Sequence, residues 1–484
     1  MTTSQSKFEE AIEFHQKGQF KKAVASYDSA IANKSDFVAA YFNRGVALQS
    51  LLQLEAAVES FEHAITLKPN YWEAYFCRGC ALEKLNRLEE ALDSYNCVIA
   101  LEPNYAESFS NRGNVLQALK QLNAAIESYN RAIAINPNLA EAYSNRANIF
   151  IMLRHFDQAI ADYEKAISLS PNNAGFHWFL AWCYLLMGDF AHGWEEHEWR
   201  NRYLTASFQP DFINQPSWTG KQSLSGKTIL LWCENGGFGD SIHFVRYVEN
   251  ISQLGATIYV LTQAELKPLF ESMSKITNVI LYGQPLPDCD YQCSILSLPH
   301  RFKTNIDTIP AKIPYLTSNS QKVDTWKYKL NDNRLKIGIV WKSNANYTGG
   351  AIERYIDLAE LLSVFDENIL VVSLRNIIDE HDQEILNKHP HVLHFEDELH
   401  DFSDTAALIE CLDLVISIDT AVAHLAGAMG KPVWILLWEF ADWRWLLDRE
   451  DSPWYPTAYL FRQDKEGDWS NVIKKIKAKL SSTY

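Results

Sequence analysis

The first two hundred residues repeat every 34 positions. A small residue recurs once per repeat, an alanine follows twelve positions later, and an aromatic residue four positions after that. These columns include Gly45, Gly79, Gly113 and Ala147, then Ala57, Ala91, Ala125 and Ala159, then Phe61, Tyr95, Tyr129 and Tyr163. Small residues let paired helices approach, and the proline that closes each repeat, such as Pro69, ends the second helix. Each helical pair leaves an apolar face uncovered, so the pairs must stack into a superhelix with a concave groove.

The pattern closely resembles the tetratricopeptide repeat, with six repeats over residues 1–200. One column of the first helices carries asparagine at Asn43, Asn111 and Asn145. An asparagine amide both donates and accepts, so the column can grip a bound peptide backbone or bond neighbouring loops equally well. In the large nucleocytoplasmic glycosyltransferases that carry such arrays, an asparagine ladder holds acceptor peptide. That resemblance favours an acceptor groove for a protein or peptide partner. The last repeat is far more aromatic than the others, and we expect it to dock onto the next domain.

Composition excludes several classes of partner. With 484 residues the chain is too long for one core, and its net charge of −16 repels phosphate backbones and anionic lipids. The start, "MTTSQSKFEEAIEF", has no signal-peptide pattern, and runs such as "VWILLWEF" are too short to span a membrane. We therefore expect a cytoplasmic, soluble protein that binds no nucleic acid and spans no membrane, with homo-oligomers possible.

The rest of the chain alternates between short apolar runs and helical patterns. After a connection at 201–226, "TILLWC", "TIYVLT" and "NVILYG" predict strands in a domain over 227–320, and "LKIGIVWKS", "ILVVSL", "LDLVISI" and "VWILLW" predict a second domain over 334–484. Strands that alternate with helices predict parallel sheets. The expected fold class is α + α/β, a superhelix followed by two Rossmann-like domains, with ligands at the carboxyl ends of the strands.

The segment "DTAVAHLAGAMGKPVW", residues 419–434, comes directly after a predicted strand and opens a helix. A helix N-terminus favours an anion such as phosphate, although Asp419 and Thr420 could also simply cap the helix around a packed His424. The run strongly resembles the donor-binding segment of GT-B glycosyltransferases of the heptosyltransferase-like group. The resemblance implies that Asp419, Thr420, Ala421 and His424 hold the diphosphate of a nucleotide sugar. Where the family often has glycine, this chain has Ala421.

A second motif, "CENGGFGDSIHFVRY", directly follows the first strand of the first α/β domain. Gly236, Gly237 and Gly239 permit a tight loop and a close ligand approach, but the dinucleotide fingerprint G-x-G-x-x-G is not present. In heptosyltransferase-like enzymes the aspartate of "G-x-G-D" is the proposed general base. The resemblance gives this catalytic role to Asp240, and a helix N-cap is the alternative role.

Two further segments supply cations. Lys342, Ser343 and Asn344 end a predicted strand, with Arg354 in the following loop, and suit a β-phosphate that gains charge as the sugar leaves. The sequence "WKSN" differs from the "W-x-G-N" that is commoner in the repeat-bearing bacterial transferases. In the segment 439–463 the tryptophans are expected to pack in the core, whereas Arg444 is expected to contact the donor.

Metal binding is not expected. Asp288 and Asp290 form a D-x-D pair, the metal site of the other major glycosyltransferase fold, but they precede a predicted strand in a layout that resembles GT-B. No histidine spacing typical of a metal site occurs, and no cofactor is predicted.

Together these features predict a glycosyltransferase. It would move a sugar from a nucleotide sugar to an acceptor hydroxyl, a Ser or Thr of a protein recruited by the repeats, and the resemblance implies inversion without a metal. Two alternatives are a non-catalytic scaffold with a nucleotide-binding module and a transferase acting on a glycan or lipid-linked acceptor.

Overall fold

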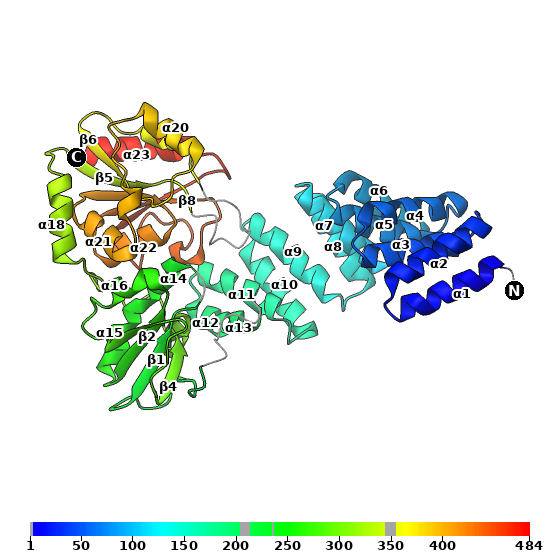
Figure 1. Ribbon diagram of the computed structural model, residues 1–484, viewed down its shortest axis with the longest axis horizontal. Coiled ribbons are helices and arrows are strands. Elements are labelled where there is room, and N and C mark those ends of the chain that lie inside the picture. Colours follow the sequence, from blue (N-terminus) through cyan, green and yellow to red (C-terminus); the bar gives the residue numbers. More distant parts are fainter. Residues whose placement is uncertain (1–2, 204–212, 235–236, 344–354) are drawn as a thin grey trace. The chain divides into compact units, whose positions relative to one another are not determined.

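The computed structural model describes residues 3–203, 213–234, 237–343 and 355–484 (Figure 1). The chain forms two compact units, residues 1–176 and 177–484. The repeat pattern runs on to about residue 200, but the helices after residue 176 belong to the second unit. The reason is the aromatic character of the last repeat, whose side chains pack within the second unit.

The first unit consists of paired antiparallel helices. Its helices are α1 (Thr3–Gln16), α2 (Phe20–Asn33), α3 (Val38–Ser50), α4 (Leu54–Leu67), α5 (Trp72–Lys84), α6 (Leu88–Leu101), α7 (Ala106–Ala118), α8 (Leu122–Ile135), α9 (Ala140–Met152) and α10 (Phe156–Leu169), and α11 (Ala174–Leu186) crosses into the second unit. A Cβ added at Gly113 would lie 2.5 Å from the ring of Tyr129, and one at Gly45 would lie 2.6 Å from that of Phe61. The glycine and aromatic columns therefore interlock, and the predicted helical repeat is confirmed.

An arginine column, which the repeat pattern did not single out, ties neighbouring pairs of helices together. Arg78 bonds Glu62 at 2.9 Å and Ser94 at 2.9 Å, each sixteen residues away. Arg146 forms an ion pair at 2.6 Å with Asp162, which occupies the position of Ser94, and donates to Asn130, which occupies the position of Glu62. Because each arginine reaches the second helices of its own and the preceding repeat, the column stitches the stack along its length.

The second unit begins within α11, continues with α12 (Phe190–His197) and α13 (Arg200–Tyr203), and contains two parallel sheets. The first sheet has the order β3-β2-β1-β4, formed by β1 (Thr228–Trp232), β2 (Thr257–Thr262), β3 (Asn278–Leu281) and β4 (Tyr291–Ser294). Leu230 of β1 pairs with Tyr259 of β2 and with Gln292 of β4. Its short helices are α14 (Phe238–Phe244), η1 (Val245–Tyr247), α15 (Val248–Gln253), η2 (Ala264–Leu266), α16 (Lys267–Phe270), η3 (Ile295–Ser297) and α17 (Leu298–Arg301).

The second sheet has the order β6-β5-β7-β8-β9. Its strands are β5 (Leu335–Val340), β6 (Ile369–Ser373), β7 (Leu414–Ile418), β8 (Val433–Leu437) and β9 (Ala458–Arg462). The helices are α18 (Ser320–Lys329), α19 (Leu358–Leu362), α20 (Glu380–Lys388), η5 (Glu396–Glu398), α21 (Phe402–Glu410), α22 (Ala421–Ala428), η6 (Trp443–Trp445) and α23 (Ser470–Thr483). The strands β6, β7 and β8 are buried along their whole length, as expected of a parallel sheet covered on both faces. The expected α + α/β class is confirmed, whereas β9 was not predicted.

Candidate functional site

The strand order of both sheets marks where a ligand can enter. In the second sheet the chain passes from β5 outward to β6 and then returns to β7, on the other side of β5. The first sheet has the same kind of reversal, because β2 and β4 lie on opposite sides of β1. At such a reversal the loops after the two central strands diverge and leave a crevice. Lys342 and Ser343 come after β5, and Asp419 and Thr420 come after β7. The predicted donor residues therefore flank the crevice of the second sheet.

The first turns of α14 and α22 meet between the two sheets. A Cβ built on Gly239 would lie 3.0 Å from Cδ2 of His424 and 3.6 Å from Cα of Ala421. Figure 1 shows the two helices side by side. The two motifs, about 180 residues apart in sequence, thus form one site, and Asp240 adjoins the contact.

The close approach of the two helices explains why residue 239 is a glycine. We expect Gly239→Ala to destabilise the second unit, because overpacking costs about 1–3 kcal/mol against about 1 kcal/mol gained in helix propensity. A Cβ at Gly237 would meet its nearest atom only at 3.9 Å, so Gly237→Ala is the matched control with the smaller effect. Tryptophan fluorescence can follow the unfolding, since Trp72 alone of the fifteen tryptophans precedes residue 177. Equal losses in both variants would contradict the contact.

Asp240 is held by Arg444. It is the third residue of α14, whose N-cap is Gly237, so it does not cap the helix as the alternative interpretation supposed. The Arg444 guanidinium forms an ion pair with Asp240 and a second one, at 2.9 Å, with Asp442. The Asp240 side chain is 35% exposed, against 10% for Arg444. Burial raises the pKa of Asp240, and Arg444 only partly offsets this effect. A carboxyl with a raised pKa is suited to accept a proton.

His424 is the fourth residue of α22. Its Nε2 is 3.7 Å from Oδ1 of Asp419, and its Nδ1 is 2.9 Å from the hydroxyl of Tyr455. The ring of Trp445 stacks on it with 5.3 Å between centroids. Thr420 is the N-cap residue of α22, but its side chain contacts Ser417 at 3.0 Å instead of capping the helix. Ala421 is the first helical residue.

Lys342 lies at the crevice with a carboxylate already against it. It forms an ion pair at 3.0 Å with Asp379, the N-cap residue of α20, and Arg375 donates to the carbonyl of Lys342 at 2.5 Å. Ser343 is half-buried beside it. The other residues predicted in these segments, Gly236, Asn344 and Arg354, lie outside the described residues.

The asparagine column of the repeats makes contacts between repeats. Asn111 donates to the hydroxyl of Tyr95 at 3.5 Å, and Asn145 donates to Oδ1 of Asn114 at 2.9 Å. Asn43 is half-buried. Both partners lie on helices of the preceding repeat, α6 and α7, and not on the neighbouring loops that the alternative interpretation named. An acceptor-binding role would have to use the remaining donors and carbonyl oxygens.

The last repeat docks onto the first sheet's domain through buried groups of the second unit. Trp194 donates to the carbonyl of Thr304 at 2.9 Å and packs edge-on against Trp443 at 5.1 Å. Arg200, 1% exposed, pairs with Glu234 at 2.6 Å, and Glu234 directly precedes the glycine-rich loop. The expectation that the aromatic last repeat contacts the next domain is thus confirmed.

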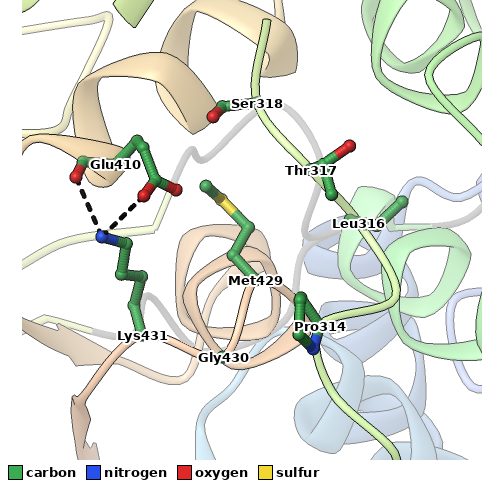
Figure 2. A pocket seen from close by; sticks show the side chains of 8 residues that line it. All are labelled: Pro314, Leu316, Thr317, Ser318, Glu410, Met429, Gly430 and Lys431. Atoms are coloured by element: carbon green, nitrogen blue, oxygen red, sulfur yellow. Dashed lines mark hydrogen bonds and ion pairs between the residues drawn. The ribbon is translucent and has the colours of Figure 1, made fainter. Parts of the chain in front are cut away.

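A cavity of about 480 Å³ lies at the other end of α22 (Figure 2). Its lining includes Met429 and Gly430, directly after the helix, and the chain segment at Pro314. Figure 2 shows Lys431 bonded to both the carboxylate and the carbonyl of Glu410, at 3.0 and 2.9 Å. This cavity lies at the opposite end of α22 from the first turn, where Asp419, Thr420 and His424 are placed.

The second carboxylate of the D-x-D pair, that of Asp290, contacts the protein itself. Asp290 accepts from the backbone N–H of Thr228 at 2.8 Å and pairs with Lys227 at 2.8 Å, and hydrogen bonds from these two residues lower its pKa to about 2. In the described part of the chain, no cluster of three or more His, Cys, Asp or Glu side chains could hold a metal ion.

Comparison with known proteins agrees with this arrangement. Residues 352–437 match the family model "Glycosyltransferase family 9 (heptosyltransferase)", and residues 13–51, 38–71, 72–105, 106–139 and 140–173 match tetratricopeptide repeat models. The chain carries tetratricopeptide repeats and a family 9 glycosyltransferase domain.

Among curated proteins, Protein FlbA of Caulobacter vibrioides is 25% identical over 326 residues, which are 60% of this chain; the match spans about half, 52%, of FlbA. Among solved structures, MamA from Desulfovibrio magneticus is 19% identical and covers 35% of this chain and 96% of its own, with a TM-score of 0.34. A tetratricopeptide repeat protein of Thermus thermophilus is 21% identical and covers 38% of this chain and all of its own, with a TM-score of 0.31. Among the described residues, no helix is long and apolar enough to cross a membrane.

Sequence reasoning missed the groups that hold the predicted residues in place. Asp442, which shares Arg444 with Asp240, and Tyr455, which contacts His424, lie in the aromatic segment that we expected to pack in the core. His243 lies inside the second motif, three residues after Asp240, and its position next to the glycine-rich loop was the available signal.

Proposed function

We propose that the second unit transfers a sugar from a nucleotide sugar to a hydroxyl of a protein that the repeats recruit. The observation that carries the proposal is the meeting of α14, with Asp240, and α22, with Asp419 and His424, at the crevice edge of the sheets. The family 9 match, over residues 352–437, includes α22 with Asp419 and His424 and supports the same interpretation.

In the proposed reaction the acceptor oxygen attacks the anomeric carbon as the bond from that carbon to the diphosphate breaks. Asp240 takes the hydroxyl proton, and the nucleoside diphosphate leaves with the bonding electron pair. The N-terminus of α22 and Lys342 would stabilise the charge that develops on the diphosphate. One direct displacement inverts the anomeric centre, and with cationic groups supplied by the protein no metal is required.

A thermal-shift panel tests the proposal. The full chain is heated with UDP, GDP, ADP, dTDP and CMP and with their sugar conjugates. A true donor at a hundred times its Kd stabilises the native state by about 2.7 kcal/mol. We expect one nucleotide family to raise the melting transition reported by tryptophan fluorescence. If no nucleotide and no sugar conjugate raises the melting temperature, the proposal is contradicted. Met429→Leu, a change of similar volume in the cavity at the far end of α22, is a control that should leave the shift unchanged.

A nucleotide-binding scaffold without catalysis is a second candidate. The observation that favours it is the ion pair between Asp240 and Arg444, because the carboxylate proposed as the base is already bound to a cation. Nucleotide binding without release of a nucleoside diphosphate from any donor and acceptor would support the scaffold over the enzyme.

Replacing Arg444 should change the pH dependence of transfer. The guanidinium stabilises the Asp240 carboxylate, so Arg444→Met raises the pKa of Asp240 further. A base works only when deprotonated, so activity falls as the pH drops through that pKa, and the fall should begin at a higher pH in the variant. The measurement is kcat/KM against pH. Arg449→Met, which removes an exposed pair with Asp451, is the matched control. An unshifted acidic limb in Arg444→Met would exclude Asp240 as the base.

A further inference from the structure

A buried hydroxyl joins two histidines from the two halves of the second unit. The hydroxyl of Tyr455 lies 2.9 Å from Nδ1 of His243, on α14, and 2.9 Å from Nδ1 of His424, on α22. The Tyr455 and His243 side chains are fully buried, and His424 is 5% exposed. A Cβ at Gly427 would lie 2.5 Å from the Tyr455 ring, so the ring is wedged against α22.

The single hydroxyl hydrogen of Tyr455 cannot serve both histidines. If it goes to Nδ1 of His424, that ring carries its proton on Nε2, and His243 must donate from Nδ1. If it goes to His243 instead, or to the neighbouring Tyr315, then His424 must donate from Nδ1 and its Nε2 is bare. Tyr315 itself donates to the carbonyl of Ile242 at 3.1 Å, so toward Tyr455 it can only accept.

The surrounding charges select the first arrangement. Nε2 of His424 lies 3.7 Å from Oδ1 of Asp419, where an N–H is attracted to the carboxylate and a bare lone pair is repelled. Nε2 of His243 has no hydrogen-bond partner within the described ranges, and a buried N–H without an acceptor would lose a full hydrogen bond. Burial, together with Arg246, Arg444 and His424, lowers the pKa of His243 well below its usual range, so its ring is neutral.

We propose that Tyr455 is a positioning residue that fixes the Nε2–H tautomer of His424 by donating its hydroxyl hydrogen to Nδ1. The consequence for catalysis rests on the proposed function. Nε2 faces the junction of Asp419 with Gly239 and Ala421, so its N–H would be ready to donate to an oxygen of the donor's diphosphate. Because Tyr455 also bonds His243, the same hydroxyl links this tautomer to the packing of the two helices.

The tautomers can be measured without any substrate. We would label the full chain with ¹⁵N-histidine and record long-range ¹H–¹⁵N correlations, which distinguish a protonated ring nitrogen from a bare one. His424→Gln and His243→Gln assign the two rings among fourteen histidines. We expect Nε2–H for His424 and Nδ1–H for His243. An Nδ1–H tautomer at His424 in the wild type overturns the proposal, and this measurement needs no Tyr455 variant to fold.

Two variants test the cause. Tyr455→Phe removes the donor to Nδ1 and leaves only the attraction of Asp419, 3.7 Å from Nε2, to favour Nε2–H, so an Nδ1–H form should appear beside it at His424. Binding of the nucleotide found in the UDP, GDP, ADP, dTDP and CMP panel should weaken by about fivefold to tenfold, the worth of one hydrogen bond. Tyr247→Phe removes an equally buried hydroxyl, bonded to Thr304 at 2.7 Å, and should leave the His424 spectrum unchanged. An unaltered His424 tautomer in Tyr455→Phe overturns the proposal. If the tautomers are as expected but none of the nucleotides binds to the protein, the result counts against the proposed function and not against the role of Tyr455.

Discussion

Asp240→Asn is expected to lower the rate of sugar transfer by about 10²–10⁴-fold, the usual contribution of a general base. Asparagine keeps the shape of the side chain and can still accept from Arg444, but it takes no proton. The donor would lie against α22 and Lys342, so nucleotide affinity should change by less than about threefold, since the lost group acts in the transition state. Initial rates and equilibrium titrations of the full chain measure the two effects.

Asp442→Asn is the matched control for this experiment. Asp442 shares the Arg444 guanidinium with Asp240 and is only 23% exposed, so both variants remove one carboxylate from the same arginine. We expect Asp442→Asn to retain most of the turnover. If the two variants lose activity equally, the charge around Arg444 matters and Asp240 is not the base. A fully active Asp240→Asn protein would exclude a catalytic Asp240 outright.

Arg200→Ala is expected to lower the free energy of unfolding of the second unit by about 3–5 kcal/mol, because it leaves a buried carboxylate unpaired. Arg200 donates to Glu234 at 2.6 Å and to Ser297 at 2.9 Å, and both members of the ion pair are nearly inaccessible, at 1% and 2%. Burial alone would lower the pKa of Arg200, but the carboxylates of Glu234 and Glu198 hold it above its ordinary value. Urea unfolding followed by tryptophan fluorescence measures the loss.

Two comparisons show whether the lost pairing is responsible. Arg334→Ala removes an arginine of the same unit from a surface pair with Asp332 and should destabilise the unit far less than Arg200→Ala. The double variant Arg200→Met with Glu234→Leu removes both charges and should recover most of the stability, since apolar side chains can replace a buried ion pair. If Arg200→Ala proves as stable as Arg334→Ala, Arg200 does not secure the last helices to the first sheet.

The repeats and strands could be predicted because they are periodic. Gly113 and Tyr129 recur at fixed offsets, and β7 and β8 are uninterrupted apolar runs bounded by turns. The first signal comes from the 34-residue repeat, and the second comes from strands that are covered on both faces of the sheet. Both can therefore be recognised in one sequence without an alignment. By contrast, β9 escaped because it comes after a stretch rich in tryptophan and proline that obscures any period.

The site was predictable only in part. The motifs located Asp240 and Asp419, but no pattern in the sequence places Gly239 against His424, because that contact depends on how the two sheets pack. Tyr455 is one aromatic residue among many in its segment, and only the fold reveals that its hydroxyl touches two histidines. The partners of predicted cations, such as Asp379 for Lys342, are likewise set by tertiary structure.

The most direct test of a transfer site between α14 and α22 is to measure nucleoside diphosphate released by the full chain. The chain would be incubated with each nucleotide sugar of the panel, alone and with polypeptides captured by residues 1–200 within the intact protein. We predict that one donor gives released diphosphate in molar excess over the protein, and that the sugar appears on a captured polypeptide. If no donor binds and none is cleaved, with or without those polypeptides, the site is not a sugar-transfer site.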